Sequence, residues 1–205
     1  MSDYPVHVEV ASPPRHDRIQ LLIRIGIAIA LGAVGITTSW LVGVLYIALP
    51  VFAAIAISSE GSEKFTSVVA PKVWRVLAWL LRLSAYMAFL ADRFPAHDDR
   101  AVTPTLQPTG HPTVGNALAR LVTSLPSGIV MLVLSFLGAV LWIVAALTVL
   151  VDAKVPELVL AFQRGLLRWQ ARLVAYHASL VAEYPPWAFD MGTSSTGGIA
   201  AAGAR

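Results

Sequence analysis

The chain has 205 residues, of which 57% are hydrophobic and 13% are charged, and its mean hydropathy is +0.69. These values exclude an ordinary soluble domain and predict an integral membrane protein. The chain contains no cysteine, which excludes disulfides, thiolate zinc sites, iron–sulfur ligation and a cysteine nucleophile. Its net charge of +3, from 15 basic and 12 acidic residues, favours contact with anionic lipid and argues against nucleic acid as a partner.

A strand signal opens the chain. Residues Tyr4 to Val10 alternate apolar and polar side chains, which predicts a short N-terminal β-strand. A single strand is unstable alone, so it either pairs with a segment that the sequence does not identify or is merely extended.

Two long stretches without charge follow, Ile25 to Ser59 and Leu121 to Val151. As single helices they would be about 52 and about 46 Å long, whereas the hydrocarbon layer of a bilayer is about 30 Å thick. We therefore interpret each stretch as a transmembrane helical hairpin, over residues 19–58 and 116–152. In the first, the weakly polar residues between 32 and 40 predict the turn.

The second stretch leaves an alternative open. Gly138 is its main interruption, so Ser127 to Val151 could form one tilted span instead. The positive-inside rule favours the hairpin, because a single span would send Arg164, Arg168 and Arg172 to the far side. The sequence thus predicts four membrane helices with both termini in the cytoplasm.

An internal repeat accompanies the two stretches. Residues 79–95 and 169–185 align without a gap at an offset of 90, and eight of seventeen positions are identical. The residues that precede each stretch align more weakly, with Arg24 opposite Arg120 at an offset of 96. We interpret the chain as a tandem duplication.

Each repeat ends in a predicted basic amphipathic helix, over about 71–93 and about 155–183. Tryptophan, leucine and tyrosine recur at intervals of four, three and four residues, which places them on one helical face. Basic residues beside aromatic ones are typical of a helix in the membrane interface. The candidates for membrane-interface or partner contact are Trp79, Arg82, Tyr86, Arg164, Arg168, Trp169, Arg172 and Tyr176. Packing of the same face against the hairpins or the other repeat is the alternative.

The predicted fold class is all-α integral membrane, in two repeated units. The predicted parts are a first repeat over 1–95, a proline-rich extended linker over 96–114, a second repeat over 115–187 and a flexible tail over 188–205.

Several local motifs resemble a known family. Tyr4-Pro5-Val6 forms its opening, and Arg168-Trp169-Gln-Ala-Arg172-Leu173-Val-Ala175-Tyr176 and Glu183-Tyr184-Pro185-Pro186-Trp187 form its closing. With these residues the chain resembles the bacterial membrane proteins catalogued as domain of unknown function 4389, in two copies. The resemblance implies a bacterial membrane protein of unassigned activity and supplies no catalytic residue. Together with the predicted hairpins, this predicts a multi-pass protein of the bacterial cytoplasmic membrane.

The polar residues form no recognisable catalytic or metal constellation. The five histidines are scattered, and His97-Asp98-Asp99 is interpreted as a solvated loop rather than a metal site. No nucleotide-binding glycine motif or nucleophile elbow is present, and the two stretches contain no ionisable group that a proton relay would need. We expect no enzyme activity, no cofactor and no metal.

The predicted function is that of an accessory subunit or scaffold of a membrane complex. Its predicted partners are anionic lipid headgroups and either another membrane protein or a second copy of the chain. The alternative is a lipid-handling or transport protein with a cavity between the repeats. A third hypothesis, a headgroup enzyme, would bring His97, Asp98 or Asp99 to Glu183.

Overall fold

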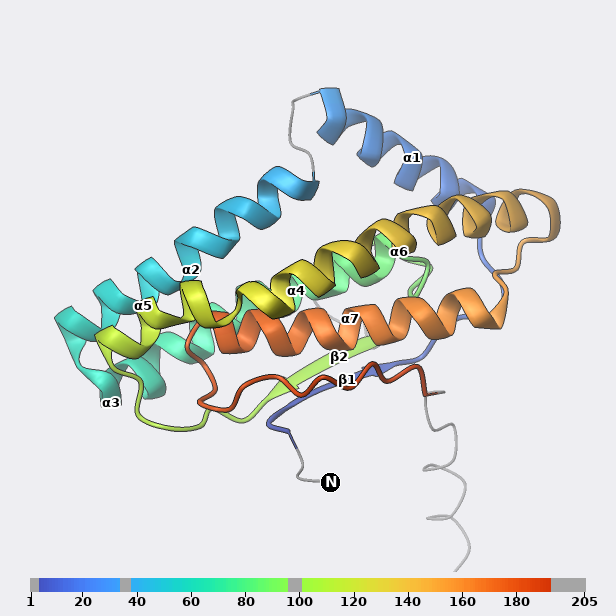
Figure 1. The fold of residues 1–205 in the computed structure, drawn as a ribbon. Coiled ribbons are helices and arrows are strands. Elements are labelled where there is room, and N and C mark those ends of the chain that lie inside the picture. The colour runs from blue at the N-terminus through green and yellow to red at the C-terminus, as the bar shows by residue number, and fades with distance from the viewer. Residues whose placement is uncertain (1–3, 34–37, 96–100, 193–205) are drawn as a thin grey trace, which may run out of the picture.

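The computed structural model describes residues 4–33, 38–95 and 101–192. This part of the chain is mainly helical, with a sheet of two strands. Figure 1 shows the arrangement: α7 (Glu157–His177) lies between α6 (Leu125–Asp152) and the sheet, and α4 (Ala70–Met87) packs beside α7.

The sheet confirms the predicted N-terminal strand. β1 (Val6–Val10) pairs antiparallel with β2 (Val102–Leu106), and Val6, Val8 and Val10 are buried while the residues between them are exposed. The buried valines pack on α4 and α7 in one hydrophobic core. The strand partner therefore lies within the segment that the sequence predicts as an extended linker.

Pro104 explains why the sequence gives no strand signal for β2. It faces Val8 in the ladder. The N–H of Ala11 donates to Ala101 O and that of Gln107 to Pro5 O, both at 2.9 Å, so hydrogen-bonded pairs alternate with the pair that contains Pro104. At that position the missing N–H faces away from β1, and proline is tolerated on such an edge.

The prediction of an all-α integral membrane fold with two transmembrane hairpins is wrong. Residues 125–152 form one continuous helix, α6, of 28 residues. By length and composition it is the one helix among the described residues that could cross a membrane. The structure thus has the single helix that the sequence leaves as the alternative for this stretch.

Gly138 packs inside this helix and makes no turn. A Cβ atom at Gly138 would lie 2.9 Å from Leu166 Cδ2, and Gln163 Nε2 donates to Gly138 O at 3.0 Å. The glycine therefore allows α7 to approach α6 closely. The arginines that favoured a hairpin lie on α7, which folds back along α6, so they do not mark the far end of a membrane span.

The first uncharged stretch forms α1 (Arg18–Ala33) and α2 (Thr38–Glu60), on either side of residues 34–37, which lie outside the described part. The predicted turn over residues 32–40 falls partly there. The two helices diverge in Figure 1: α1 packs on α6, whereas α2 packs on α5 (Val114–Thr123). The short α3 (Ser62–Lys64) and the π-helical turn η1 (Phe65–Val69) lead from α2 into α4.

Helices α4 and α7 correspond to the two predicted amphipathic helices, and their ends are built alike. Phe89 and Ser179 both have φ of 62°. The next residues close the helix in the same way: Leu90 N donates to Ala85 O at 2.9 Å, and Leu180 N donates to Ala175 O at 3.0 Å. These bonds and left-handed residues are typical of helix C-termini. The alignment at an offset of 90 therefore reproduces a shared local structure.

Candidate functional site

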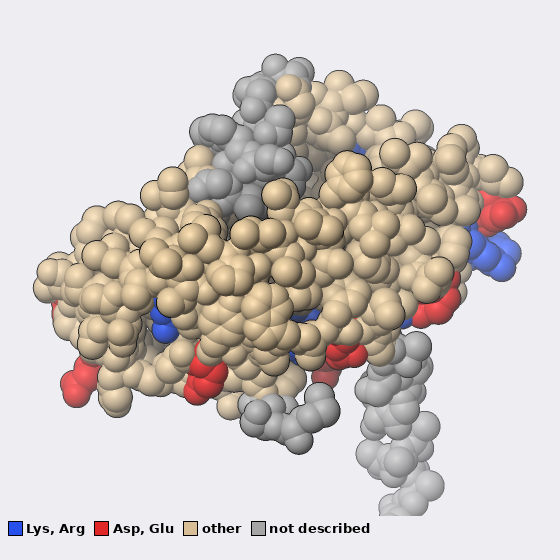
Figure 2. All heavy atoms as spheres, in the orientation of Figure 1, with Lys and Arg blue, Asp and Glu red and all other residues tan. Residues whose placement is uncertain are grey.

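Exposed hydrophobic side chains of α1, α2 and α6 form what we call the apolar face. On α6, Phe136 is 75% exposed and Val151 is 70% exposed. The other members include Ile19, Leu22, Ile29, Ile47, Phe52, Ile55, Ile129, Leu132, Val133, Val140, Ile143, Leu147 and Leu150. Figure 2 shows uncharged atoms over most of this face, whereas charged side chains gather along its lower edge and at one end. An exposed patch of this extent is typical of a lipid or protein contact surface.

The aromatic candidates on α4 and α7 lie mostly in the interior. Tyr86, Trp169 and Tyr176 are buried, and Trp79 is 40% exposed. The Trp169 ring packs edge-on against Trp187, with centroids 6.0 Å apart. In the structure these three rings pack among helices and the C-terminal segment. This arrangement corresponds to the alternative interpretation of the sequence, in which the aromatic face packs inside the protein. Contact of Trp79 with lipid or a partner stays a prediction.

The arginine candidates bind neighbouring segments of the same chain. Arg82 Nε donates to Val102 O of β2 at 3.2 Å. Arg164 is 2% exposed and forms an ion pair with Glu157. Both side chains therefore hold local structure together.

Arg168 and Arg172 bind the segment that follows α7. Arg168 Nη1 lies 3.2 Å from Asp190 Oδ2, and Arg172 Nη1 donates to Ala188 O at 3.4 Å. The Arg172 guanidinium also lies 5.9 Å from the centroid of Tyr4. These contacts fasten residues 188–190 to α7, in a part of the chain that the sequence predicts as a flexible tail.

Arg24, in α1, is fully buried at the end of α4. Its Nε donates to Tyr86 O at 2.8 Å and its Nη2 donates to Ala91 O at 2.7 Å. Nη2 lies 3.8 Å from Asp92 Oδ1, and the guanidinium carbon lies 4.4 Å from the Tyr86 centroid. Burial lowers the pKa of the Arg24 guanidinium, and the charges of Tyr86 and Asp92 oppose that shift.

Arg120, in α5, makes the corresponding contact at the end of α7. Its Nη1 donates to Tyr176 O, and its guanidinium carbon lies 4.4 Å from the Tyr176 centroid. The side chain is 7% exposed, and burial lowers the pKa of its guanidinium. The sequence alignment set Arg24 opposite Arg120 but gave neither a role, because an arginine beside an apolar stretch is ordinarily a membrane-flanking charge.

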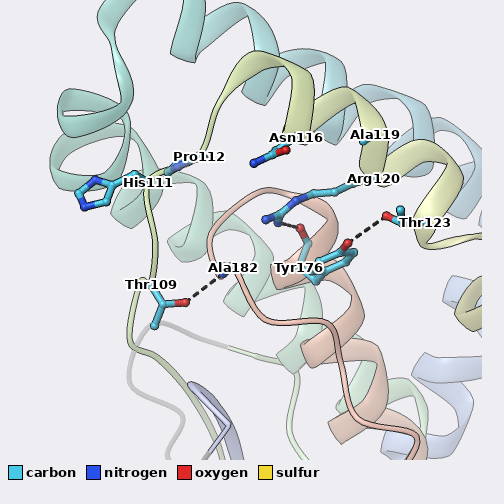
Figure 3. Close-up of a pocket in the computed structure, with 9 residues that line it drawn as sticks. All are labelled: Thr109, His111, Pro112, Asn116, Ala119, Arg120, Thr123, Tyr176 and Ala182. Carbon is cyan, nitrogen blue, oxygen red and sulfur yellow. Dashed lines mark hydrogen bonds between the residues drawn. The ribbon is translucent and has the colours of Figure 1, made fainter.

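A pocket of about 210 Å³ opens beside Arg120, between α5, the end of α7 and the loop that follows β2. Its lining is shown in Figure 3 and consists of Thr109, His111, Pro112, Asn116, Ala119, Arg120, Thr123, Tyr176 and Ala182. The Thr109 hydroxyl accepts from Ala182 N at 3.0 Å and donates to Glu183 Oε2 at 2.5 Å. The pocket is therefore small and rich in hydrogen-bonding groups.

Two histidines are buried in the core. His16 Nε2 donates to Phe89 O at 2.9 Å, and His177 stacks on Tyr46 with ring centroids 4.4 Å apart. Burial lowers the pKa of both imidazoles. Over the described ranges, no three His, Asp or Glu side chains are grouped as metal ligands would be. The cluster at residues 97–99 lies outside those ranges.

The comparisons with known proteins identify one segment. Residues 115–188 match the family model described as Domain of unknown function (DUF4389). No curated protein and no solved structure matches the chain. The match covers α5, α6, α7 and the closing Tyr184-Pro185-Pro186 motif, so the resemblance is confirmed there, while the tandem duplication stays a prediction. Residues 115–188 of this chain therefore belong to the DUF4389 family.

Proposed function

We propose that this protein is a membrane-associated accessory or scaffold protein that binds a bilayer through its apolar face. The observation that carries the proposal is the separation of exposed side chains: hydrophobic ones cover α6 and its neighbours, and charged ones lie along the edge below them (Figure 2). Burial of one such hydrophobic side chain is worth about 1.5–3 kcal/mol, so several together favour insertion.

The packing of α6 favours insertion of the face rather than a crossing. α7 packs along α6, and β1 packs on α7, so a crossing α6 would carry both into the hydrocarbon. Those elements bear exposed charges, among them Glu157 and Glu9. A charged residue near the bilayer centre costs about 2.5–3.5 kcal/mol. An interfacial position, with α6 near the membrane plane, avoids this cost.

We assign the protein to the cytoplasmic side of a bacterial inner membrane. Basic residues exceed acidic ones in the chain, and the anionic lipids of the cytoplasmic leaflet attract basic groups. The polar layer, which contains the sheet and the outer sides of α4 and α7, then faces a partner protein or a second copy. We infer no enzyme activity and no cofactor.

Lipid handling is the second candidate, and the polar pocket beside Arg120 supports it. That pocket lies at the end of α7 rather than between the two predicted repeats, so it suits recognition of a headgroup better than transport of a whole lipid.

Vesicle flotation after cell-free synthesis with liposomes tests the proposal. Full-length protein should float, and Leu132→Asn combined with Phe136→Asn should reduce the floating fraction at least fivefold, since both side chains are about two-thirds or more exposed on α6. Val76→Asn is the matched control, because Val76 is 61% exposed but lies on α4, one turn from Lys72. Equal flotation of both variants would contradict binding through the apolar face.

A further inference from the structure

We propose that the pocket beside Arg120 binds a phosphate group, supplied by the headgroup of a membrane phospholipid. The phosphate site follows from the pocket itself, and the lipid as its source rests on the proposed function.

The two buried arginines differ in one partner. In the first half of the chain, which contains α1 and α4, Asp92 Oδ1 lies 3.8 Å from Arg24 Nη2. The second half contains α5 and α7. At the offset of 90 that relates the ends of α4 and α7, the residue at the Asp92 position is Ala182. Ala182 lines the pocket beside Arg120. Where the first half has a carboxylate, the second half thus has an alanine methyl group and an open space.

Among the described residues, the Arg120 guanidinium consequently has no carboxylate in direct contact, and the charge of Glu183 acts on it from beyond ion-pair distance, opposing the lowering of its pKa by burial. In the described part of the chain, no carboxylate lies within 4.0 Å of its nitrogens, and Tyr176 O is its one hydrogen-bond acceptor. The Tyr176 ring covers one side of the guanidinium (Figure 3). A buried cation without a paired anion is unfavourable, so binding of an anion beside it releases free energy.

The rest of the lining suits phosphate oxygens. The Asn116 amide lies next to Arg120, the Thr123 hydroxyl bonds to the Tyr176 hydroxyl at 2.9 Å, and the His111 ring lines the opposite side of the pocket and points away from Arg120 (Figure 3). The pocket also borders the first turn of α5, where the helix dipole favours negative charge. The carboxylate of Glu183 accepts a hydrogen bond from the hydroxyl of Thr109, which lines the pocket.

The position of α5 favours a lipid as the source of the phosphate. Leu118 is 42% exposed and Val122 is 68% exposed on α5, and α6 begins two residues after that helix ends. A phosphate on Arg120 would therefore lie at headgroup depth when the apolar face is inserted. A volume of about 210 Å³ accommodates a headgroup and leaves no room for acyl chains.

Ala182→Asp gives a direct test, because it installs the carboxylate that the first half already has. Full-length protein in a neutral detergent is titrated with inorganic phosphate and, separately, with dihexanoyl phosphatidylglycerol, while its Tm is followed by tryptophan fluorescence. We expect both ligands to raise the Tm, with the phospholipid half-saturating at a concentration at least tenfold lower. Ala182→Asp should weaken both at least tenfold, whereas Ala188→Asp, an exposed site with the same charge change, should not.

The outcomes separate the claims. Unchanged binding by Ala182→Asp, or no rise in Tm with either ligand, overturns the site. A rise with inorganic phosphate that the phospholipid does not exceed overturns the lipid source. Flotation of Ala182→Asp should stay normal because the apolar face is intact, and phosphate binding by the Leu132→Asn, Phe136→Asn variant should persist even when its flotation is lost. Failure of the site and failure of the proposed function are thereby distinguished.

Discussion

Arg24 Nε donates a hydrogen bond to the backbone carbonyl of Tyr86 at 2.8 Å, although the two residues are 62 positions apart. The bond joins the first turns of α1 to the C-terminal end of α4, where carbonyl groups lack helical partners. The same guanidinium lies over the Tyr86 ring and is fully buried. One cation therefore closes a helix end and fixes the direction in which α1 leaves the core.

Arg24→Met should lower the stability of the protein substantially. The change removes two hydrogen bonds to buried carbonyls, Tyr86 O and Ala91 O, and the contact with the aromatic ring. Each hydrogen bond to a charged group is worth about 1.5–3 kcal/mol, so a loss of about 3–5 kcal/mol is expected. Thermal unfolding in detergent measures it. Arg15→Met, at an exposed position, should leave the Tm nearly unchanged; equal effects at both sites would refute the role of Arg24.

Gly138→Val should destabilise the contact between α6 and α7. An added Cβ would lie 2.9 Å from Leu166 Cδ2, and overpacking of this kind costs about 1–3 kcal/mol. Gly128→Val is the control, because its Cβ would lie 3.8 Å from Tyr46, at an ordinary contact distance. Unfolding in detergent compares the two variants.

A second substitution makes this prediction specific. Leu166→Ala removes the atoms that the new side chain meets, so it should restore part of the stability lost in Gly138→Val. If the two changes were additive, or if Gly128→Val were the more harmful, Gly138 would not be the close contact between these helices.

The periodic parts of the sequence predicted local structure well. Alternation at Val6, Val8 and Val10 gave the buried side of β1, and the spacing of four, three and four gave α4 and α7. In both patterns one side of the element faces the core and the other faces solvent. Hydrophobic residues therefore recur with the period of a strand or of a helix, which identifies the element. They did not reveal what covers the buried side: the Trp169 ring packs edge-on against Trp187 of the C-terminal segment.

The uncharged stretches predicted the architecture poorly, for a physical reason. A long apolar helix with one exposed side and one packed side has the same composition as a membrane span. A glycine at position 138 is compatible with a turn and with a close helix–helix contact. The sequence does not show that Leu166 packs against it, and this contact distinguishes the two roles. The role of Arg120 likewise depends on what stands at position 182, 62 residues away, which no local pattern reports.

Depth measurement along α6 tests the central claim most directly. The chain has no cysteine, so single cysteines at Leu132, Phe136, Ile143 and Leu150 can each carry a spin label without a background substitution. In liposomes, relative accessibility to oxygen and to a polar nickel reagent reports the depth of each label. We expect four similar, shallow depths, as for a helix lying near the membrane plane. A depth that changes by about 1.5 Å per residue through the bilayer centre would show a crossing helix and contradict the account.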